Sequence, residues 1–141
     1  MNTKIKILHL EDAPSDAELI RILLKKSKLN FETLVVSTRE QYIHALDTYC
    51  PDIILSDHSL PAFDSHAALA ILHQSGKHIP FILITAVMSD EYAVDIIKKG
   101  ADDYLLKDRP SRLPSAIQAS LEKFRLEAER KVIYNELIDN E

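Results

Sequence analysis

Short apolar segments alternate with helical patterns along most of the 141-residue chain, and the segments lie at 4–10, 31–36, 53–56, 79–84 and 103–106. No hairpin turn signal joins one segment to the next. Parallel strands need a long crossover, usually a helix, whereas antiparallel neighbours can be joined by a tight turn. The alternation therefore predicts an α/β fold, a five-stranded parallel sheet flanked by five helices. A flavodoxin-like strand order, 2-1-3-4-5, with an extended C-terminal helix, is expected.

Signals for the ends of helices stand between these segments. Two Ser-x-x-Glu patterns, at 15–18 and 37–40, match the capping box, in which the first and fourth residues bond each other's backbone N–H groups. They predict the starts of the first two helices. Ser89 is expected to cap the fourth helix, and Gly100 to end it in the left-handed conformation that glycine adopts easily. The fifth helix is expected to begin near Ser111.

The central strand is predicted at Ile53-Ile-Leu55, which is followed at once by Ser56 and Asp57. An unbroken apolar run is typical of a strand that is buried on both faces of a sheet. Such a strand places Asp57 at its carboxyl end, the edge of an open parallel sheet where ligands bind. An aspartate in this position also caps turns, so its role depends on what the neighbouring strands bring to the same edge.

Polar side chains follow four of the predicted strands where each strand ends, namely Glu11 and Asp12, Asp57, Thr85 and Lys107. If these strands are neighbours, three carboxylates, a hydroxyl and an ammonium share one small cleft. Three carboxylates repel one another unless a cation neutralises them, and Mg²⁺ prefers oxygen ligands of this kind. The set predicts a magnesium site where Lys107 and Thr85 donate to a phosphoryl group while an aspartate attacks phosphorus.

The chain resembles the response-regulator receiver domains of two-component signalling over residues 4–125. The resemblance rests on four fragments in the same order along the chain, LEDAP from residue 10, SDHSLP from residue 56, ITA from residue 84 and GADDYLLK from residue 100. All four lie at predicted strand ends, which makes their combination specific although each fragment alone is weak.

The resemblance implies a role for each matching position at the metal site. Asp57 matches the phosphoacceptor and one of the Mg²⁺ ligands. Asp12 matches the direct metal ligand, and Glu11 its neighbour, which acts through water. The backbone carbonyl of Ser59 matches the third protein ligand.

The resemblance also implies how the phosphoryl group is held and sensed. Thr85 and Lys107 match the groups that bind the phosphoryl oxygens. Tyr104 matches the aromatic residue that moves inward when the threonine is drawn to the phosphoryl group. Thr85 and Tyr104 are therefore the expected switch residues.

Three positions depart from the family pattern. Asp108 follows Lys107, where the family usually has a proline joined by a cis bond, and a non-proline cis bond costs about 2.5–4 kcal/mol, so a trans bond is predicted. Ser65 stands where the loop after Asp64 often carries glycine. His58 beside Asp57 is unusual, and it is either a half-exposed loop residue or one that tunes the lifetime of the phosphate.

Composition limits the location and the partners. The formal net charge of −5 gives no electrostatic reason to expect nucleic-acid binding by this chain alone. There is no apolar run of membrane-spanning length and no signal-peptide pattern, so a cytoplasmic protein without a membrane segment is expected. Cys50 is the only cysteine, which excludes an internal disulfide, and the six histidines show no tight metal-binding spacing.

A helical pattern continues beyond the predicted domain. Residues 1–125 are expected to form the receiver domain and 126–141 a helical extension, with apolar contacts available at Leu126, Val132, Ile133 and Leu137. Three interpretations stay open. The extension is a solvated helix that frays, a connector to an output module, or the seam of a homodimeric coiled coil.

The predicted function is a phosphorylation switch. A histidine kinase or a histidine phosphotransfer protein donates a phosphoryl group to Asp57 with Mg²⁺, and the surface of the fourth helix, fifth strand and fifth helix changes for a downstream effector or fused output domain. The domain would catalyse only its own phosphorylation and dephosphorylation.

Other functions are compatible with parts of the pattern. A constitutive interaction module of the same fold is the main alternative, and failure to bind Mg²⁺ would support it. A metal-dependent phosphatase commonly needs a second aspartate two residues beyond the nucleophile, where this chain has Ser59, and there is no cap insertion. An FMN-binding flavodoxin is disfavoured because no Ser/Thr/Gly-rich phosphate loop follows the first strand.

Overall fold

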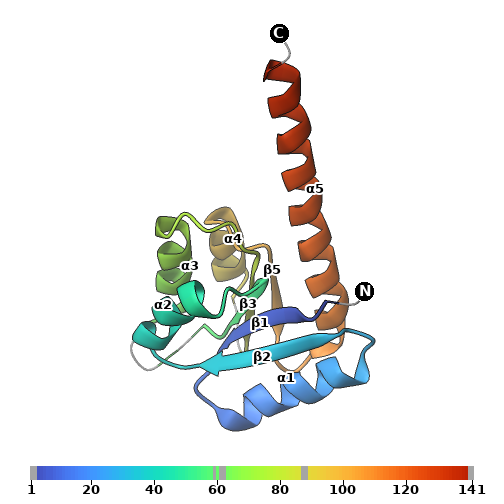
Figure 1. The fold of residues 1–141 in the computed structure, drawn as a ribbon. Helices are drawn as coiled ribbons and strands as arrows, with labels where there is room; N and C mark the ends of the chain where they lie inside the picture. The colour runs from blue at the N-terminus through green and yellow to red at the C-terminus, as the bar shows by residue number, and fades with distance from the viewer. Residues whose placement is uncertain (1–2, 59, 61–62, 87–88, 140–141) are drawn as a thin grey trace.

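Strands and helices alternate throughout the computed structural model, which describes residues 3–58, 60, 63–86 and 89–139. The elements are labelled in Figure 1 and lie, in chain order, at β1 (Ile5–Leu10), α1 (Pro14–Lys26), β2 (Phe31–Val36), α2 (Arg39–Thr48), β3 (Ile53–Ser56), α3 (Ser65–Gln74), β4 (Phe81–Thr85), α4 (Asp90–Lys98), β5 (Asp103–Leu106), the short 3₁₀ helix η1 (Pro110–Arg112) and α5 (Leu113–Asp139).

The five strands form one parallel sheet in the order β2-β1-β3-β4-β5. Leu10 at the end of β1 pairs with Val36 of β2 and Ser56 of β3, and Thr85 of β4 pairs with Leu106 of β5. This register aligns the carboxyl ends of the strands at one edge. The predicted fold class and strand order are confirmed.

Helices cover both faces of the sheet. Figure 1 shows α1 and α5 on one face, and α2, α3 and α4 on the other. Alternate residues of β1 face opposite sides of the sheet. Ile7 packs in the apolar layer that contains Leu24 and Ile117, and Leu8 packs in the layer that contains Tyr42 and Leu72. Every residue of β3 is buried, as predicted for the central strand. Burying one such side chain fully stabilises the fold by about 1.5–3 kcal/mol. The packing of β3 against both apolar layers therefore holds the end of this strand in place.

The first helix begins differently from the prediction. Its N-cap is Ala13, whose side chain makes no capping bond, and Pro14 is the first helical residue. The predicted capping box at Ser15 is therefore wrong. Proline at the first helical position has its φ angle already set and lacks an N–H that would have no partner there, so Pro14 starts the helix before Ser15.

The second helix is capped one residue later than predicted. Thr38 accepts from the backbone N–H of Gln41 at 3.1 Å, and the Gln41 side chain accepts from the Thr38 N–H at 3.3 Å. The box is thus Thr38–Gln41, and the predicted box of Ser37 and Glu40 is wrong. The predicted cap of α4 is confirmed, because the Ser89 hydroxyl accepts from the N–H of Tyr92 at 3.2 Å.

The C-terminal part contains one further difference. The chain turns through η1 before α5, so the last α-helix begins at Leu113 rather than near Ser111. No cis peptide bond is found in the part of the chain that is described, and the Lys107–Asp108 bond is trans as predicted. The predicted positive φ of Gly100 is also confirmed, at 115°.

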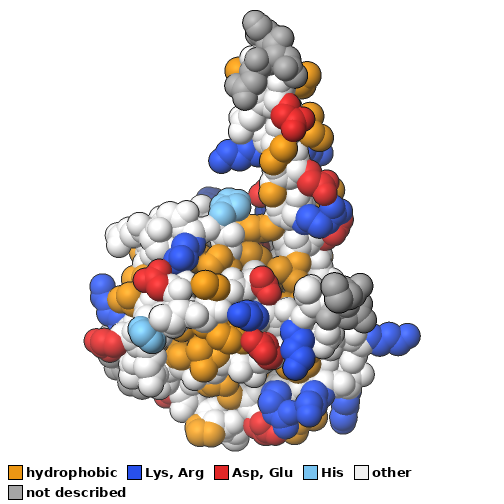
Figure 2. Space-filling model, in the orientation of Figure 1, with side chains coloured by type: hydrophobic (Ala, Val, Ile, Leu, Met, Phe, Trp, Pro, Cys, Tyr) orange, Lys and Arg blue, Asp and Glu red, His pale blue; other side chains and the backbone are white. Residues whose placement is uncertain are grey.

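Helix α5 extends well past the sheet. Its first turns are buried at Leu113, Ala116 and Ile117, whereas Leu126 is 45% exposed and Leu137 is 65% exposed. In Figure 1 the second half of α5 projects from the body, and Figure 2 shows apolar side chains along this projection. Over the described ranges, no helix combines the length and apolar character needed to cross a membrane.

Candidate functional site

Backbone hydrogen bonds between neighbouring strand ends build the edge that carries the site. The N–H of Asp57 donates to the carbonyl of Leu10 at 2.9 Å, and the N–H of Lys107 donates to the carbonyl of Thr85 at 2.8 Å. The N–H of Glu11 continues the ladder to β2. Residues that directly follow three different strands are therefore held side by side, as expected for the carboxyl edge of a parallel sheet.

The ammonium of Lys107 lies among three carboxylates. Its Nζ is 2.6 Å from Glu11 Oε1, 2.8 Å from Asp16 Oδ2 and 3.2 Å from Asp57 Oδ2. The Lys107 and Asp57 side chains are only 17% and 13% exposed, so water screens the contact between these two weakly. One positive charge is therefore shared by three negative ones.

This crowding of charge shifts the pKa values of Glu11 and Lys107. Burial raises the pKa of Glu11, whose side chain is 1% exposed, and the nearby charge of Asp57 raises it further against the opposing effect of Lys107. Burial disfavours the ammonium of Lys107, but hydrogen bonds to Asp16 and Glu11 outweigh this and raise its pKa. The cluster keeps a surplus of negative charge that an additional cation would relieve.

Three carboxylates are placed to share such a cation. Glu11, Asp12 and Asp57 each offer an oxygen, and the three oxygens lie within 4.8 Å of one another. Glu11 is buried and Asp12 is exposed, so the set opens to solvent on one side. Hard oxygen donors around a position that water can reach fit Mg²⁺, which usually keeps several waters. The predicted ligand Ser59 lies outside the described residues.

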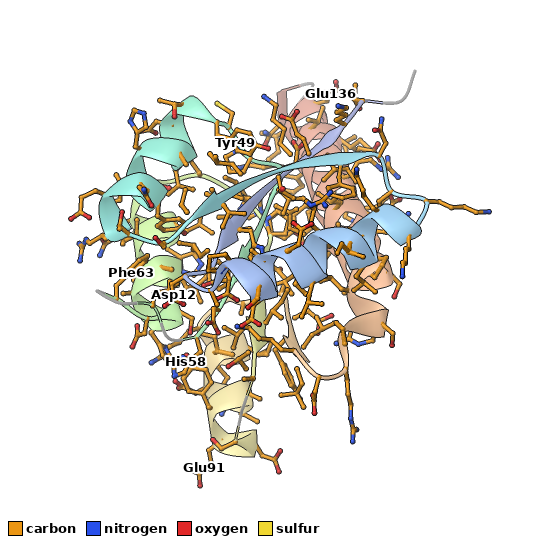
Figure 3. The ribbon with its side chains drawn as sticks, turned by 90° about the horizontal axis from the view of Figure 1, so that it is seen from below. Asp12, Tyr49, His58, Phe63, Glu91 and Glu136 are labelled. Carbon is orange, nitrogen blue, oxygen red and sulfur yellow. The ribbon has the colours of Figure 1, made fainter. Side chains whose placement is uncertain are left out.

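The carboxylate of Asp57 is held from two sides. Its Oδ1 accepts the backbone N–H of His58 at 2.8 Å, and its Oδ2 faces Lys107. Figure 3 shows His58 and Asp12 on the same side of the molecule, at this edge of the sheet. The two oxygens therefore have different surroundings.

The two predicted switch residues lie on adjacent strands. Thr85 ends β4 and is 4% exposed, and Tyr104 on β5 is 39% exposed. Tyr104 borders a surface hollow of about 390 Å³ that is otherwise lined by α4 residues, among them Val94 and Ile97. The Tyr104 ring thus lies at the α4–β5 surface.

Two residues near the cluster were missed by sequence reasoning. Asp16 was interpreted only as part of a capping box, but α1 starts directly after the strand-end acids, and its first turn brings Asp16 to Lys107. Pro14 was the available signal, because it marks an immediate helix start at this edge. His9 on β1 is 3% exposed, and burial, followed by the charge of Lys107, lowers its pKa to about 4.

Comparison with known proteins identifies the family. Residues 7–118 match the family described as the response regulator receiver domain. The chain belongs to this family. It is thus a receiver domain of the kind that works in two-component signal transduction.

Relatives of this receiver domain are longer proteins. The DNA-binding response regulator MtrA of Mycolicibacterium smegmatis is 29% identical over 119 residues, which cover 84% of this chain and 51% of MtrA. The alkaline phosphatase synthesis transcriptional regulatory protein PhoP of Bacillus subtilis is 26% identical, over 96% of this chain and 56% of PhoP. The chain spans about half the length of these two relatives.

Solved receiver domains share the fold. The signal receiver domain of a LuxO repressor protein from Vibrio parahaemolyticus superposes with a TM-score of 0.81 at 28% identity, covering 89% of this chain and 96% of that one. The BeF₃-activated N-terminal receiver domain of Klebsiella pneumoniae RstA gives a TM-score of 0.73 at 27% identity, covering 82% and 97%. The strand order expected from the sequence is thus that of a family fold.

Proposed function

We propose that this receiver domain accepts a phosphoryl group on Asp57 from a histidine kinase or a histidine phosphotransfer protein. The observation that carries the proposal is the position of the Asp57 carboxylate, 3.2 Å from Lys107 Nζ and within 4.8 Å of Glu11 and Asp12 oxygens. A carboxylate, an ammonium beside it and a set of metal ligands at one opening are the parts that phosphoryl transfer to an aspartate needs.

The transfer forms one bond and breaks one bond. An oxygen of Asp57 forms a bond to the phosphorus of the donor's phosphohistidine, and the P–N bond breaks. Its electron pair goes to the imidazole, which takes up a proton from solvent. Lys107 and Thr85 donate to the phosphoryl oxygens. Glu11, Asp12 and Asp57, with the carbonyl of Ser59, would hold Mg²⁺, which offsets negative charge on the transferring group.

The output of the switch is proposed at the surface of α4, β5 and α5. Tyr104 lies on β5, which pairs with the strand that Thr85 ends, and its side chain borders the hollow lined by α4. Inward movement of the ring would change this face, which a downstream effector or an attached output domain would sense. The extension of α5 beyond residue 125 would connect to such a domain or pair with a second chain.

Intact-mass spectrometry tests the proposal directly. Purified chain is incubated with acetyl phosphate and Mg²⁺, beside an Asp57→Asn variant and a sample with chelator. We expect a single phosphate adduct in the wild type and none in the variant or with chelator. Absence of an adduct from the wild type would contradict the proposal and favour the constitutive interaction module.

A further inference from the structure

Two of the three positions that depart from the family pattern, His58 and Ser65, are in contact. We propose that Ser65 and Tyr92 are positioning residues for Asp57 that act through His58. The inference rests on the proposed phosphoryl transfer to Asp57 and names residues that set its rate.

Three hydrogen bonds in series connect α4 to the Asp57 carboxylate. The Tyr92 hydroxyl bonds the Ser65 hydroxyl at 2.5 Å, and Ser65 Oγ lies 3.0 Å from Nδ1 of the His58 ring. The backbone N–H of His58 then donates to Asp57 Oδ1 at 2.8 Å. The chain of contacts therefore ends on the oxygen of Asp57 that does not face Lys107.

Ser65 holds His58 at two points. Besides the contact between the side chains, the backbone N–H of Ser65 donates to the carbonyl of His58 at 3.0 Å. Ser65 is the first residue of α3 and is fully buried. A buried hydroxyl that bridges two ring-bearing side chains has few alternative partners, and losing one partner leaves polar groups unsatisfied. A glycine at position 65 would supply only the backbone bond.

Tyr92 is itself fixed by its surroundings. Its ring meets the edge of the His58 ring with centroids 4.3 Å apart, and that of His66 at 4.9 Å. His66 in turn contacts Asp95 and Lys99, each at 3.5 Å. The cluster joins the loop after β3 to α3 and α4, and Figure 3 shows His58 close to α4. Residues of α3 and α4 therefore hold the His58 ring in place.

These contacts restrict rotation of the Asp57 carboxylate. A carboxylate that accepts one bond on each oxygen keeps its plane fixed, and the attacking oxygen stays aligned with the donor. Misalignment of reacting groups by small amounts lowers rates strongly, because orientation supplies much of the rate of such a step. Releasing the His58 ring would loosen its N–H and let the Asp57 carboxylate rotate.

The test measures the rate of Asp57 phosphorylation in matched variants, at several concentrations of acetyl phosphate with saturating Mg²⁺. Ser65→Ala and Tyr92→Phe each remove one hydroxyl. We expect each to lower the maximal rate about three- to tenfold, the range for one lost hydrogen bond, with the half-saturating donor concentration unchanged. The double variant should be no slower than the slower single variant, because both act through one chain of contacts.

Two further variants separate positioning from general damage to the fold. His58→Asn places an amide near the Nδ1 position and should keep most of the rate, whereas His58→Ala should lose it. Tyr134→Phe, an exposed tyrosine on the extension, is the matched control and should react as the wild type. Thermal unfolding checks that each variant is folded at the assay temperature.

The outcomes distinguish this inference from the proposed function. Unchanged rates in the Ser65 and Tyr92 variants, or fully additive effects in the double variant, would overturn the inference. A phosphate adduct on the wild type would still support the proposed function in that case. Absence of any adduct in the wild type would overturn both, because no reaction would remain for these residues to position.

Discussion

At the scale of residues, the electrostatics of the site depend on the ammonium of Lys107. Lys107 Nζ is closer to Asp16, at 2.8 Å, than to Asp57, at 3.2 Å. The two carboxylates therefore compete for it, and Asp16 lies on the more exposed side, with 37% of its side chain accessible. We infer that Asp16 holds Lys107 partly away from the phosphoryl position.

Neutralising Asp16 tests this competition. Asp16→Asn keeps the shape of the side chain but weakens its pull on the ammonium, since an amide lacks the charge that strengthens such a bond. We expect phosphorylation of Asp57 by acetyl phosphate to become about two- to fivefold faster, a change of the size of one weakened exposed ion pair. Rates come from intact mass against time.

Glu18→Gln is the control for this variant. It also removes an acid from α1, but one that pairs with Arg21 instead of Lys107. Its rate should match the wild type. A slower reaction in Asp16→Asn would show that Asp16 assists Lys107, which is the opposite of our expectation.

The buried His9 predicts a loss of stability in mild acid. Its pKa falls from 6.5 to about 4 in the folded protein because burial disfavours the charged ring. Between these values the unfolded chain binds more protons, so stability falls as the pH falls. From about pH 7 to pH 5 the histidine should account for about 2 kcal/mol of lost unfolding free energy.

Urea unfolding at the two pH values measures this contribution. His9→Leu removes the titrating ring, so the difference between the two pH values should shrink by about 2 kcal/mol relative to the wild type. His44→Leu, at an exposed histidine of α2, should leave the difference unchanged. An equal pH dependence in His9→Leu and the wild type would contradict the prediction.

How much of the candidate site could be predicted depends on where each residue lies relative to a strand. Glu11, Asp57 and Lys107 directly follow strands, so the parallel fold and the expected strand order together predict that they meet. Asp16 comes from a helix, and its approach depends on where that helix starts. The bond between His58 and Ser65 depends on side-chain rotamers across a loop, which no spacing in the sequence reports.

At the scale of elements, capping decides where each helix begins. Both Ser37 and Thr38 have a side chain suited to an N-cap, and both are followed by a polar residue three positions later. The structure selects Thr38, whose backbone is extended with φ −113° and ψ 158°. Sequence patterns locate a helix start to within a residue or two, whereas the packing of the preceding strand chooses among adjacent candidates.

Stability measurements distinguish the two candidates. Thr38→Ala removes the acceptor for the Gln41 N–H and should lower the free energy of unfolding by about 1 kcal/mol. Ser37→Ala is the matched control, and it should change the free energy by less than about 0.3 kcal/mol because that side chain caps nothing in the structure. A larger loss in the Ser37 variant would support the box first predicted from the sequence.

The alternation of elements carried more information than their boundaries. Five apolar runs without hairpin turns fix a parallel sheet, and right-handed crossovers leave few strand orders. The mixed residues of β2 fit its position at one edge of the sheet, opposite β5. The length of η1 and the late start of α5 could not be predicted, because Pro110 and Pro114 are both compatible with a first helical turn.

At the scale of the whole molecule, the body and the extension of α5 should be energetically separate. Among the described side chains, those of residues 126–138, a chain that ends at Arg125 loses only exposed ones. It also loses two exposed contacts, of Glu127 with His78 at 3.7 Å and of Glu129 with Arg125. Its unfolding free energy should stay within about 0.5 kcal/mol of that of the longer chain. The prediction also tests the domain boundary at residue 125.

Urea denaturation provides the measurement, and Leu113→Ala shows that the assay is sensitive. That fully buried residue anchors the start of α5, and its truncation should cost about 2–5 kcal/mol. A loss of similar size on removing the extension would mean that residues beyond 125 stabilise the domain, for instance by pairing two chains. Sedimentation velocity of both lengths would then identify the pairing.

The length of α5 gives the molecule a lever arm. The helix has 27 residues, or about 40 Å at 1.5 Å per residue, and it is clamped by buried side chains only near its first turns. A tilt of about 10° at the clamp would carry the far end through about 5 Å, since nearly 30 Å of helix lies beyond Ser120. A change at the β5–α5 surface too small to break a contact there becomes, at the tip, as large as the rise of one helical turn.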